Sequence, residues 1–127
     1  MSRAAIYSLV ALGGALGALA RVVVGDLVAR RMGTAWPWGT LLINVSGCFV
    51  IALFLGVIAA RALHPGWRYL LPVGFVGAYT TFSTFEYEVQ QLIASGAWRG
   101  AAAYVIASNV AGFLAVLLGG AAARLLR

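Results

Sequence analysis

Residues 74–86 read GFVGAYTTFSTFE, and this stretch decides how the rest of the chain is interpreted. Two glycines, Gly74 and Gly77, come before a cluster of hydroxyl-bearing side chains, and this composition makes a poor continuous helix. The hydroxyl-bearing residues are Tyr79, Thr80, Thr81, Ser83 and Thr84. We therefore predict a helix that is broken near residues 77–81. Backbone carbonyls exposed by such a break bind a cation when they line a cavity.

All of this stretch except Glu86 lies within one of four long runs that contain no charged residue, at positions 4–20, 32–60, 69–85 and 100–123. A helix that crosses a bilayer needs about 20 mostly apolar residues. Strands of a membrane barrel would alternate in polarity, and these runs are uniformly apolar. The pattern predicts an all-α membrane protein with one domain, residues 1–127. Its four transmembrane helices are expected near 4–28, 37–60, 69–95 and 100–123, the third of them broken.

The composition of the 127-residue chain supports this class, because 63% of the residues are hydrophobic and only 9% are charged. Soluble domains carry about 25% charged residues. A single cysteine, Cys48, excludes an internal disulfide, and a single histidine, His64, excludes a pair of histidine metal ligands. We find no nucleophile with a base and no glycine-rich nucleotide motif in a suitable context. The sequence therefore predicts no enzyme, no organic cofactor and no nucleic-acid partner.

The four tryptophans stand where the uncharged runs meet the charged residues, at positions 36, 38, 67 and 98. This placement is typical of an aromatic belt at the membrane interface. In the first run, Gly13 and Gly17 form a small-residue pattern that favours close helix packing. Arg3 followed by an apolar stretch ending in Ala-Leu-Ala at 18–20 also resembles a secretory signal peptide. The richness in glycine rather than leucine favours a membrane helix.

All nine basic residues are arginines, and the net charge is +6. With four spans, the side that holds both termini carries Arg3, Arg61, Arg68, Arg124 and Arg127. The other side carries Arg30, Arg31 and Arg99, and also Arg21 if that residue reaches the surface. So small a bias fits either a single, weakly biased topology or insertion in both orientations. Four short helices enclose a conduction path poorly, which favours an antiparallel dual-topology homodimer.

Several polar and aromatic residues fall inside the predicted spans, where such groups are costly and often functional. Thr40 and Asn44 are four residues apart and share one helix face. Asn44 either links helices or offers donors to an ion. Phe82, Phe85 and Glu86 also share a face. Two phenyl rings presented edge-on attract an anion without a full positive charge, although both rings could equally pack against lipid or protein.

The last run places Tyr104, Ser108 and Gly112 on one stripe of a helix. The two hydroxyl groups are potential donors to an ion, and the glycine allows another segment to approach closely. The alternative is an interfacial tyrosine and a serine bonded within its own helix.

Taken together, these motifs resemble the Fluc-type fluoride channels, also called the CrcB family. The resemblance rests on three ordered motifs along nearly the whole chain. They are the string TTFSTF at 80–85 preceded by Gly74 and Gly77, the segment GTL at 39–41 followed by Asn44 and Gly47, and Gly13-Gly14 with Gly17-Ala18 followed by Arg21.

The resemblance implies a passive, fluoride-selective channel that exports cytoplasmic fluoride across the bacterial plasma (inner) membrane as a multi-pass protein. It implies an antiparallel homodimer with two fluoride pathways, each lined by Phe82 and Phe85 and by the amide of Asn44. Other pathway residues would be Thr40, Ser83, Thr84, Glu86, Tyr104 and Ser108, with Arg21 at the mouth. The backbone carbonyls of Gly77 and Thr80 from both subunits would hold a central structural Na⁺. Besides fluoride and sodium, the implied partners are a second copy of the chain and membrane lipid.

Two other classes of function remain open on the residues alone. A small dual-topology exporter of cationic drugs would need a membrane-embedded carboxylate to exchange protons, for which Glu86 is the candidate. A non-conducting membrane assembly subunit would need none of these polar groups for transport.

Overall fold

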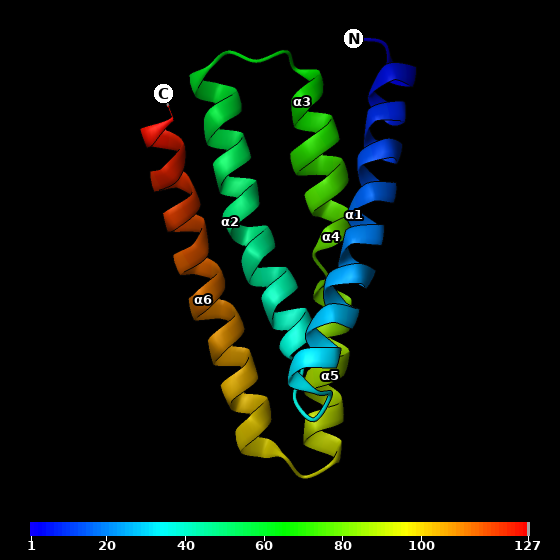
Figure 1. Ribbon diagram of the computed structural model, residues 1–127, viewed down its shortest axis with the longest axis vertical. Helices are drawn as coiled ribbons and strands as arrows, with labels where there is room; N and C mark the ends of the chain where they lie inside the picture. Colours follow the sequence, from blue (N-terminus) through cyan, green and yellow to red (C-terminus); the bar gives the residue numbers. More distant parts are fainter. Residues whose placement is uncertain (127) are drawn as a thin grey trace.

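The computed structural model describes residues 1–126 and is helical along almost its whole length. Successive segments run up and down, and both ends of the chain lie at the same end of the molecule (Figure 1). The helices are α1 (Arg3–Met32), α2 (Trp38–Ala60), α3 (Gly66–Arg68), α4 (Gly77–Tyr79), α5 (Phe82–Ala94) and α6 (Trp98–Leu125), with a π-helix, η1 (Tyr69–Val76), between α3 and α4. No strand occurs among the described residues.

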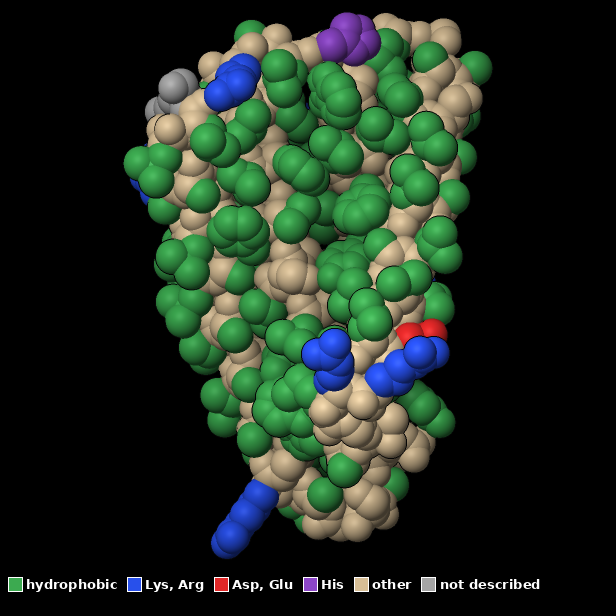
Figure 2. Space-filling model, viewed as in Figure 1, with side chains coloured by type: hydrophobic (Ala, Val, Ile, Leu, Met, Phe, Trp, Pro, Cys, Tyr) green, Lys and Arg blue, Asp and Glu red, His purple; other side chains and the backbone are tan. Residues whose placement is uncertain are grey.

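Three helices, α1, α2 and α6, are each long and apolar enough to cross a membrane. These three cover the first, second and fourth predicted spans, and α1 continues beyond residue 28 to Met32. Hydrophobic side chains dominate the upper and middle parts of the face shown in Figure 2, and basic side chains lie near the upper end and in the lower part, one of them beside an acidic side chain. This distribution matches a protein whose middle faces lipid and whose ends face water.

The predicted span 69–95 is not one long helix, and residues 66–94 form several short segments in series. Pro72 lies within η1 and has no N–H with which to complete an α-helical turn. Thr80 and Thr81 then have extended backbones, with ψ angles of 158° and 113°. The non-helical part is shorter than predicted, because Gly77 and Tyr79 belong to α4.

Two pairs of segments make the most extensive contacts, α2 with α6 and α1 with η1. Gly13 and Gly17 are buried on α1. A Cβ atom added to Gly13 would collide with the Leu70 carbonyl oxygen, and one added to Gly17 with the Phe75 carbonyl oxygen. The prediction that these glycines mark a closely packed helix face is confirmed. They let α1 lie directly against the backbone of η1.

Candidate functional site

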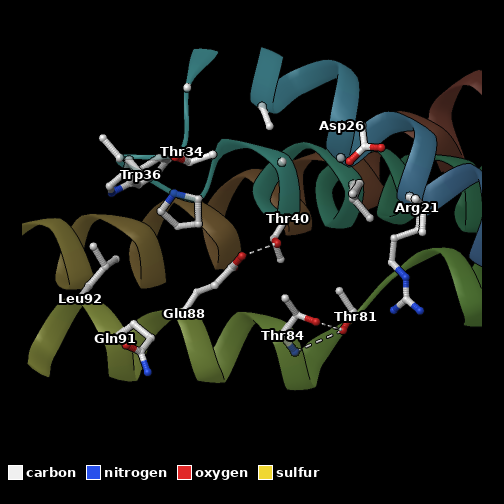
Figure 3. Close-up of a pocket in the computed structure, with 18 of the residues that line it drawn as sticks. Arg21, Asp26, Thr34, Trp36, Thr40, Thr81, Thr84, Glu88, Gln91 and Leu92 are labelled. Atoms are coloured by element: carbon white, nitrogen blue, oxygen red, sulfur yellow. Dashed lines mark hydrogen bonds between the residues drawn. The ribbon is translucent and has the colours of Figure 1, made fainter. Parts of the chain in front are cut away.

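An open pocket of about 670 Å³ lies at the end of the molecule away from the termini, between α1, α2 and α5. Its lining includes three residues predicted for the site, Arg21, Thr40 and Thr84. Figure 3 shows Arg21 near the Thr81 end of the pocket and Trp36 toward the other end. The pocket thus joins the extended residues between α4 and α5 to the loop between α1 and α2.

The side chain of Asn44 on α2 binds the extended residues through their backbone. Its Nδ2 donates to the Thr81 carbonyl oxygen at 3.0 Å, and its Oδ1 accepts from the Thr81 N–H at 2.8 Å. One turn farther along α2, Gly47 leaves room for the methyl group of Thr80. The first predicted role of Asn44, a link between segments, is therefore present in the structure. One of its two amide N–H groups makes this link, and the second is available for another acceptor.

The extended residues also begin the next helix. The hydroxyl of Thr81 accepts a hydrogen bond from the Thr84 N–H at 3.2 Å, which caps the N-terminus of α5. The same hydroxyl donates to Oγ1 of Thr84 at 2.9 Å, and the Ser83 hydroxyl lies 3.5 Å away. A capped helix start is worth about 1 kcal/mol. The hydroxyl groups of Thr81, Ser83 and Thr84 are thus gathered at the start of α5.

A carboxylate outside the predicted set forms the centre of the polar contacts. Thr40 on α2 donates to Oε1 of Glu88 at 2.8 Å, and Tyr104 on α6 donates to Oε2 of Glu88 at 2.7 Å. Hydrogen bonds that involve a charged group are roughly twice as strong as neutral ones. Glu88 therefore ties α5 to both α2 and α6, and it brings together two predicted residues that lie 64 positions apart in the chain.

The spacing of polar residues along α5 indicates that Glu88 faces the pocket. The polar residues of this segment that line the pocket are Thr81, Thr84, Glu88, Gln91 and Ser95, which we call the polar stripe. Their spacing of three and four residues is the spacing of one helix face. Phe82, Phe85 and Glu86, the residues of this helix predicted to share a face, lie on a different side of α5. Glu86 itself is exposed and Glu88 is half-buried.

Phe82 and Phe85 lie in different surroundings, with ring centroids 6.0 Å apart. Phe85 is only 7% exposed and meets the ring of Tyr104 edge-on at 5.0 Å. Phe82 is 74% exposed on the surface of the single chain. Within one chain, therefore, only Phe85 joins the buried aromatic and polar contacts of the site.

Ser108 lies one turn after Tyr104 on α6, and its hydroxyl is buried without a hydrogen-bond partner among the described residues. A buried hydroxyl without a partner is costly. Such a group has an unused donor for a water molecule or an ion. Gly112, one turn farther along the predicted stripe, is buried and faces Cys48 of α2.

The carbonyl oxygens of Gly77 and Thr80 have lost the donors that a continuous helix would supply. The Thr81 N–H, which would donate to Gly77, donates to Asn44 instead. The Thr84 N–H, which would donate to Thr80, donates to the Thr81 hydroxyl. Among the described residues, no three His, Cys, Asp or Glu side chains gather into a metal-binding group. Free backbone oxygens of this kind are the ligands that Na⁺ takes at unwound membrane helices.

Chemically, the site offers neutral donors and aromatic edges around one carboxylate, with a half-buried arginine, Arg21, at the side of the pocket. Hydroxyl and amide donors replace the hydration shell of a small anion and still release it.

Comparison with known proteins places the chain among relatives. The family model described as CrcB-like protein, Camphor Resistance (CrcB), matches residues 8–120. A relative from Acidobacterium capsulatum is 54% identical over 89% of this chain and 91% of its own length. Relatives from Solibacter usitatus and Chloroflexus aurantiacus are 44% and 46% identical, over 93% and 87% of this chain and 98% and 88% of their own lengths. All three relatives are named fluoride-specific ion channel FluC.

Proposed function

The chain belongs to the CrcB-like family, and from this membership we propose that it is a passive, fluoride-selective ion channel. It is a multi-pass membrane protein of bacterial type rather than an enzyme. In the proposed role it lets cytoplasmic fluoride leave the cell down its gradient and so protects a microbe from the ion.

The observation that carries the proposal is two sets of hydrogen bonds within otherwise apolar helices, those of Thr40 and Tyr104 to Glu88 and those of Asn44 to Thr81. Among the described residues, the second amide N–H of Asn44 and the hydroxyl of Ser108 remain as donors for an ion. Fluoride is small and strongly hydrated, so a pathway must offer donors that replace its water. Polar groups at membrane depth are costly and are retained where they serve a path or a relay. The polar stripe of α5 supplies a polar wall of such a path.

The aromatic residues have a second role in this proposal. Phe85 lies against Tyr104, and Phe82 lies one helical turn away on the exposed side of α5. The positive edges of phenyl rings attract an anion weakly enough for it to leave. The unpartnered hydroxyl of Ser108 extends the line of donors along α6. Ser83 and Thr84 add hydroxyl groups at the start of α5, Glu86 lies toward the exit, and Arg21 raises the local anion concentration at the mouth.

We also propose that residues 69–95 form a single broken transmembrane segment, with the break at Thr80 and Thr81. The carbonyls of Gly77 and Thr80 would hold Na⁺ together with the same carbonyls of a second copy. Their diverted helical donors support this role, and the oxygen donor set fits the ion. Bound Na⁺ would supply positive charge that fastens the two copies together, and it would not be transported.

The active unit in this proposal is an antiparallel dual-topology homodimer with two fluoride pathways. The nearly even distribution of arginines between the two ends supports insertion in both orientations. The exposure of Phe82 in the single chain supports a neighbour on that side of α5, because the ring can line an enclosed path only when a second copy covers it. Each copy would then complete the path of the other.

The proposal is tested by fluoride efflux from liposomes that contain the purified protein, with a potassium ionophore to balance charge. We expect rapid fluoride release and no chloride release from matched vesicles. Phe82→Ile should suppress fluoride release although the dimer still forms. Silence for both ions from a folded dimer would contradict the proposal.

A further inference from the structure

Trp36 differs from the other three tryptophans, because its ring points into the molecule. Trp98 is 64% exposed, and Trp38 and Trp67 are also exposed, as an interfacial belt requires. Trp36 is half-buried in the loop between α1 and α2. Its indole N–H donates to the Gly100 carbonyl oxygen on α6 at 3.3 Å. The loop is thereby attached to the first turn of α6.

The ring of Trp36 contacts a residue of the polar network directly. Its centroid lies 5.3 Å from that of Tyr104, with an angle of 69° between the rings. Phe85 meets the same tyrosine edge-on at 5.0 Å. Tyr104 has 0% of its surface exposed. Edge-to-face contacts of this kind prefer a defined ring placement, so Trp36 and Phe85, packed against the same ring, together hold the Tyr104 ring and the hydroxyl at its end in one position.

This position matters because the Tyr104 hydroxyl donates to Glu88 at 2.7 Å, and Thr40 donates to the other oxygen of that carboxylate. A ring displaced as a whole toward the space that Trp36 fills would carry the hydroxyl away from Glu88 and leave that carboxylate with one donor fewer. Trp36 lines the same pocket as Thr40 and Glu88. Figure 3 shows it in the loop at the end of the pocket opposite Arg21.

We propose that Trp36 is a positioning residue for anion conduction, which holds the Tyr104 hydroxyl in the pathway from a loop outside the predicted spans. This inference rests on the proposed function. It assigns to Trp36 a role that a belt tryptophan does not have. The belt role needs only a ring at the interface, as Trp98 provides, and predicts that any residue suited to the interface replaces Trp36.

The test is a double-mutant cycle in liposomes, with fluoride efflux normalised to the folded oligomer. Trp36→Leu should lower the flux by about three- to tenfold, and Trp36→Phe, which keeps an aromatic edge, by only about twofold. In a Tyr104→Phe background, Trp36→Leu should change the flux further by less than about 1.5-fold. Trp98→Leu is the matched control and should leave the flux unchanged.

Each outcome decides between the two roles. An unchanged flux in Trp36→Leu, or an equal loss in both backgrounds, would overturn the inference. If Trp36→Leu does not form the wild-type oligomer, Trp36→Phe replaces it in the cycle, and its loss must again disappear in the Tyr104→Phe background. A silent wild-type protein would overturn the proposed function and this inference with it. A conducting wild type with an unaffected Trp36→Leu variant overturns the inference alone.

Discussion

The packed pair of helices α2 and α6 runs through both halves of the molecule, and the remaining segments pack differently in each half. In the half nearer the termini, α1 lies against η1 with backbone in contact with backbone at Gly13 and Gly17. In the other half, α5 contacts α2 and α6 through hydrogen-bonded side chains, and an open pocket remains. The difference is that close backbone packing holds one half together, whereas hydrogen-bonded polar side chains gather in the other half, where we propose that an ion moves.

The largest effect is expected from adding a methyl group to the tightly packed half, where α1 lies against η1. A methyl group in Gly17→Ala would collide with the backbone of Phe75, which no side-chain rotation relieves. Overpacking of this kind costs about 1–3 kcal/mol. Gly14→Ala is the matched control, because its added Cβ would lie 4.0 Å from the Gly74 carbonyl oxygen. Thermal unfolding in detergent should show a lowered Tm for Gly17→Ala alone. Equal Tm values would contradict the account of this half.

The next largest effect is expected on fluoride efflux, from a substitution in the half that contains the open pocket, and this substitution should leave the fold intact. Tyr104→Phe removes one donor to Glu88 and keeps the ring between Phe85 and Trp36. We expect fluoride efflux to fall about tenfold, since a hydrogen bond to a charged group is lost. Tyr7→Phe removes an exposed hydroxyl from α1 and should have no effect. A normal efflux rate in Tyr104→Phe would separate this hydroxyl from the pathway.

A smaller effect is expected where the two halves join. Thr81→Val keeps the shape of the side chain and removes the acceptor for the Thr84 N–H. The stability of the protein should fall by about 1 kcal/mol, the usual cost of a lost helix cap. Denaturation followed by circular dichroism measures this loss. Wild-type stability in Thr81→Val would show that the cap does not hold the start of α5.

The smallest effect is expected at Glu86. Its side chain is exposed, and among the described residues the carboxylate that binds Thr40 and Tyr104 is Glu88. Glu86→Gln should therefore change fluoride efflux less than any of the substitutions above, and the efflux should not depend on a proton gradient. Efflux that requires the gradient and is lost in Glu86→Gln would instead support a proton-coupled exporter.

Much of the fold could be predicted from the positions of the charges, because long uncharged runs have few stable structures other than membrane helices. The glycine pattern at Gly13 and Gly17 correctly predicted a close helix contact. The irregular backbone was predicted near 77–81 and lies at Thr80 and Thr81. Its exact place depends on Asn44, whose side chain takes the Thr81 N–H away from the helix.

Two site residues could not be predicted as readily, and both depend on tertiary contacts. Glu88 was not predicted, because the predicted site residues Phe82, Phe85 and Glu86 lie on another face of α5. Its spacing from Thr81 and Thr84 nevertheless indicated a pocket-facing position. Trp36 stands beside charged residues like the other tryptophans, and only its contacts with Gly100 and Tyr104 distinguish it from a belt residue. A pattern along one helix carries no information about which neighbour completes a hydrogen bond.

The most direct test of the account compares fluoride efflux through wild-type protein and Asn44→Asp in matched liposomes. The substitution replaces the amide N–H that meets the Thr81 carbonyl with a carboxylate oxygen, and it places a negative charge in the proposed path. We predict rapid efflux from the wild type and almost none from Asn44→Asp, with the same oligomer eluting for both. Equal efflux from the two proteins would contradict the claim that the polar half of the molecule conducts fluoride.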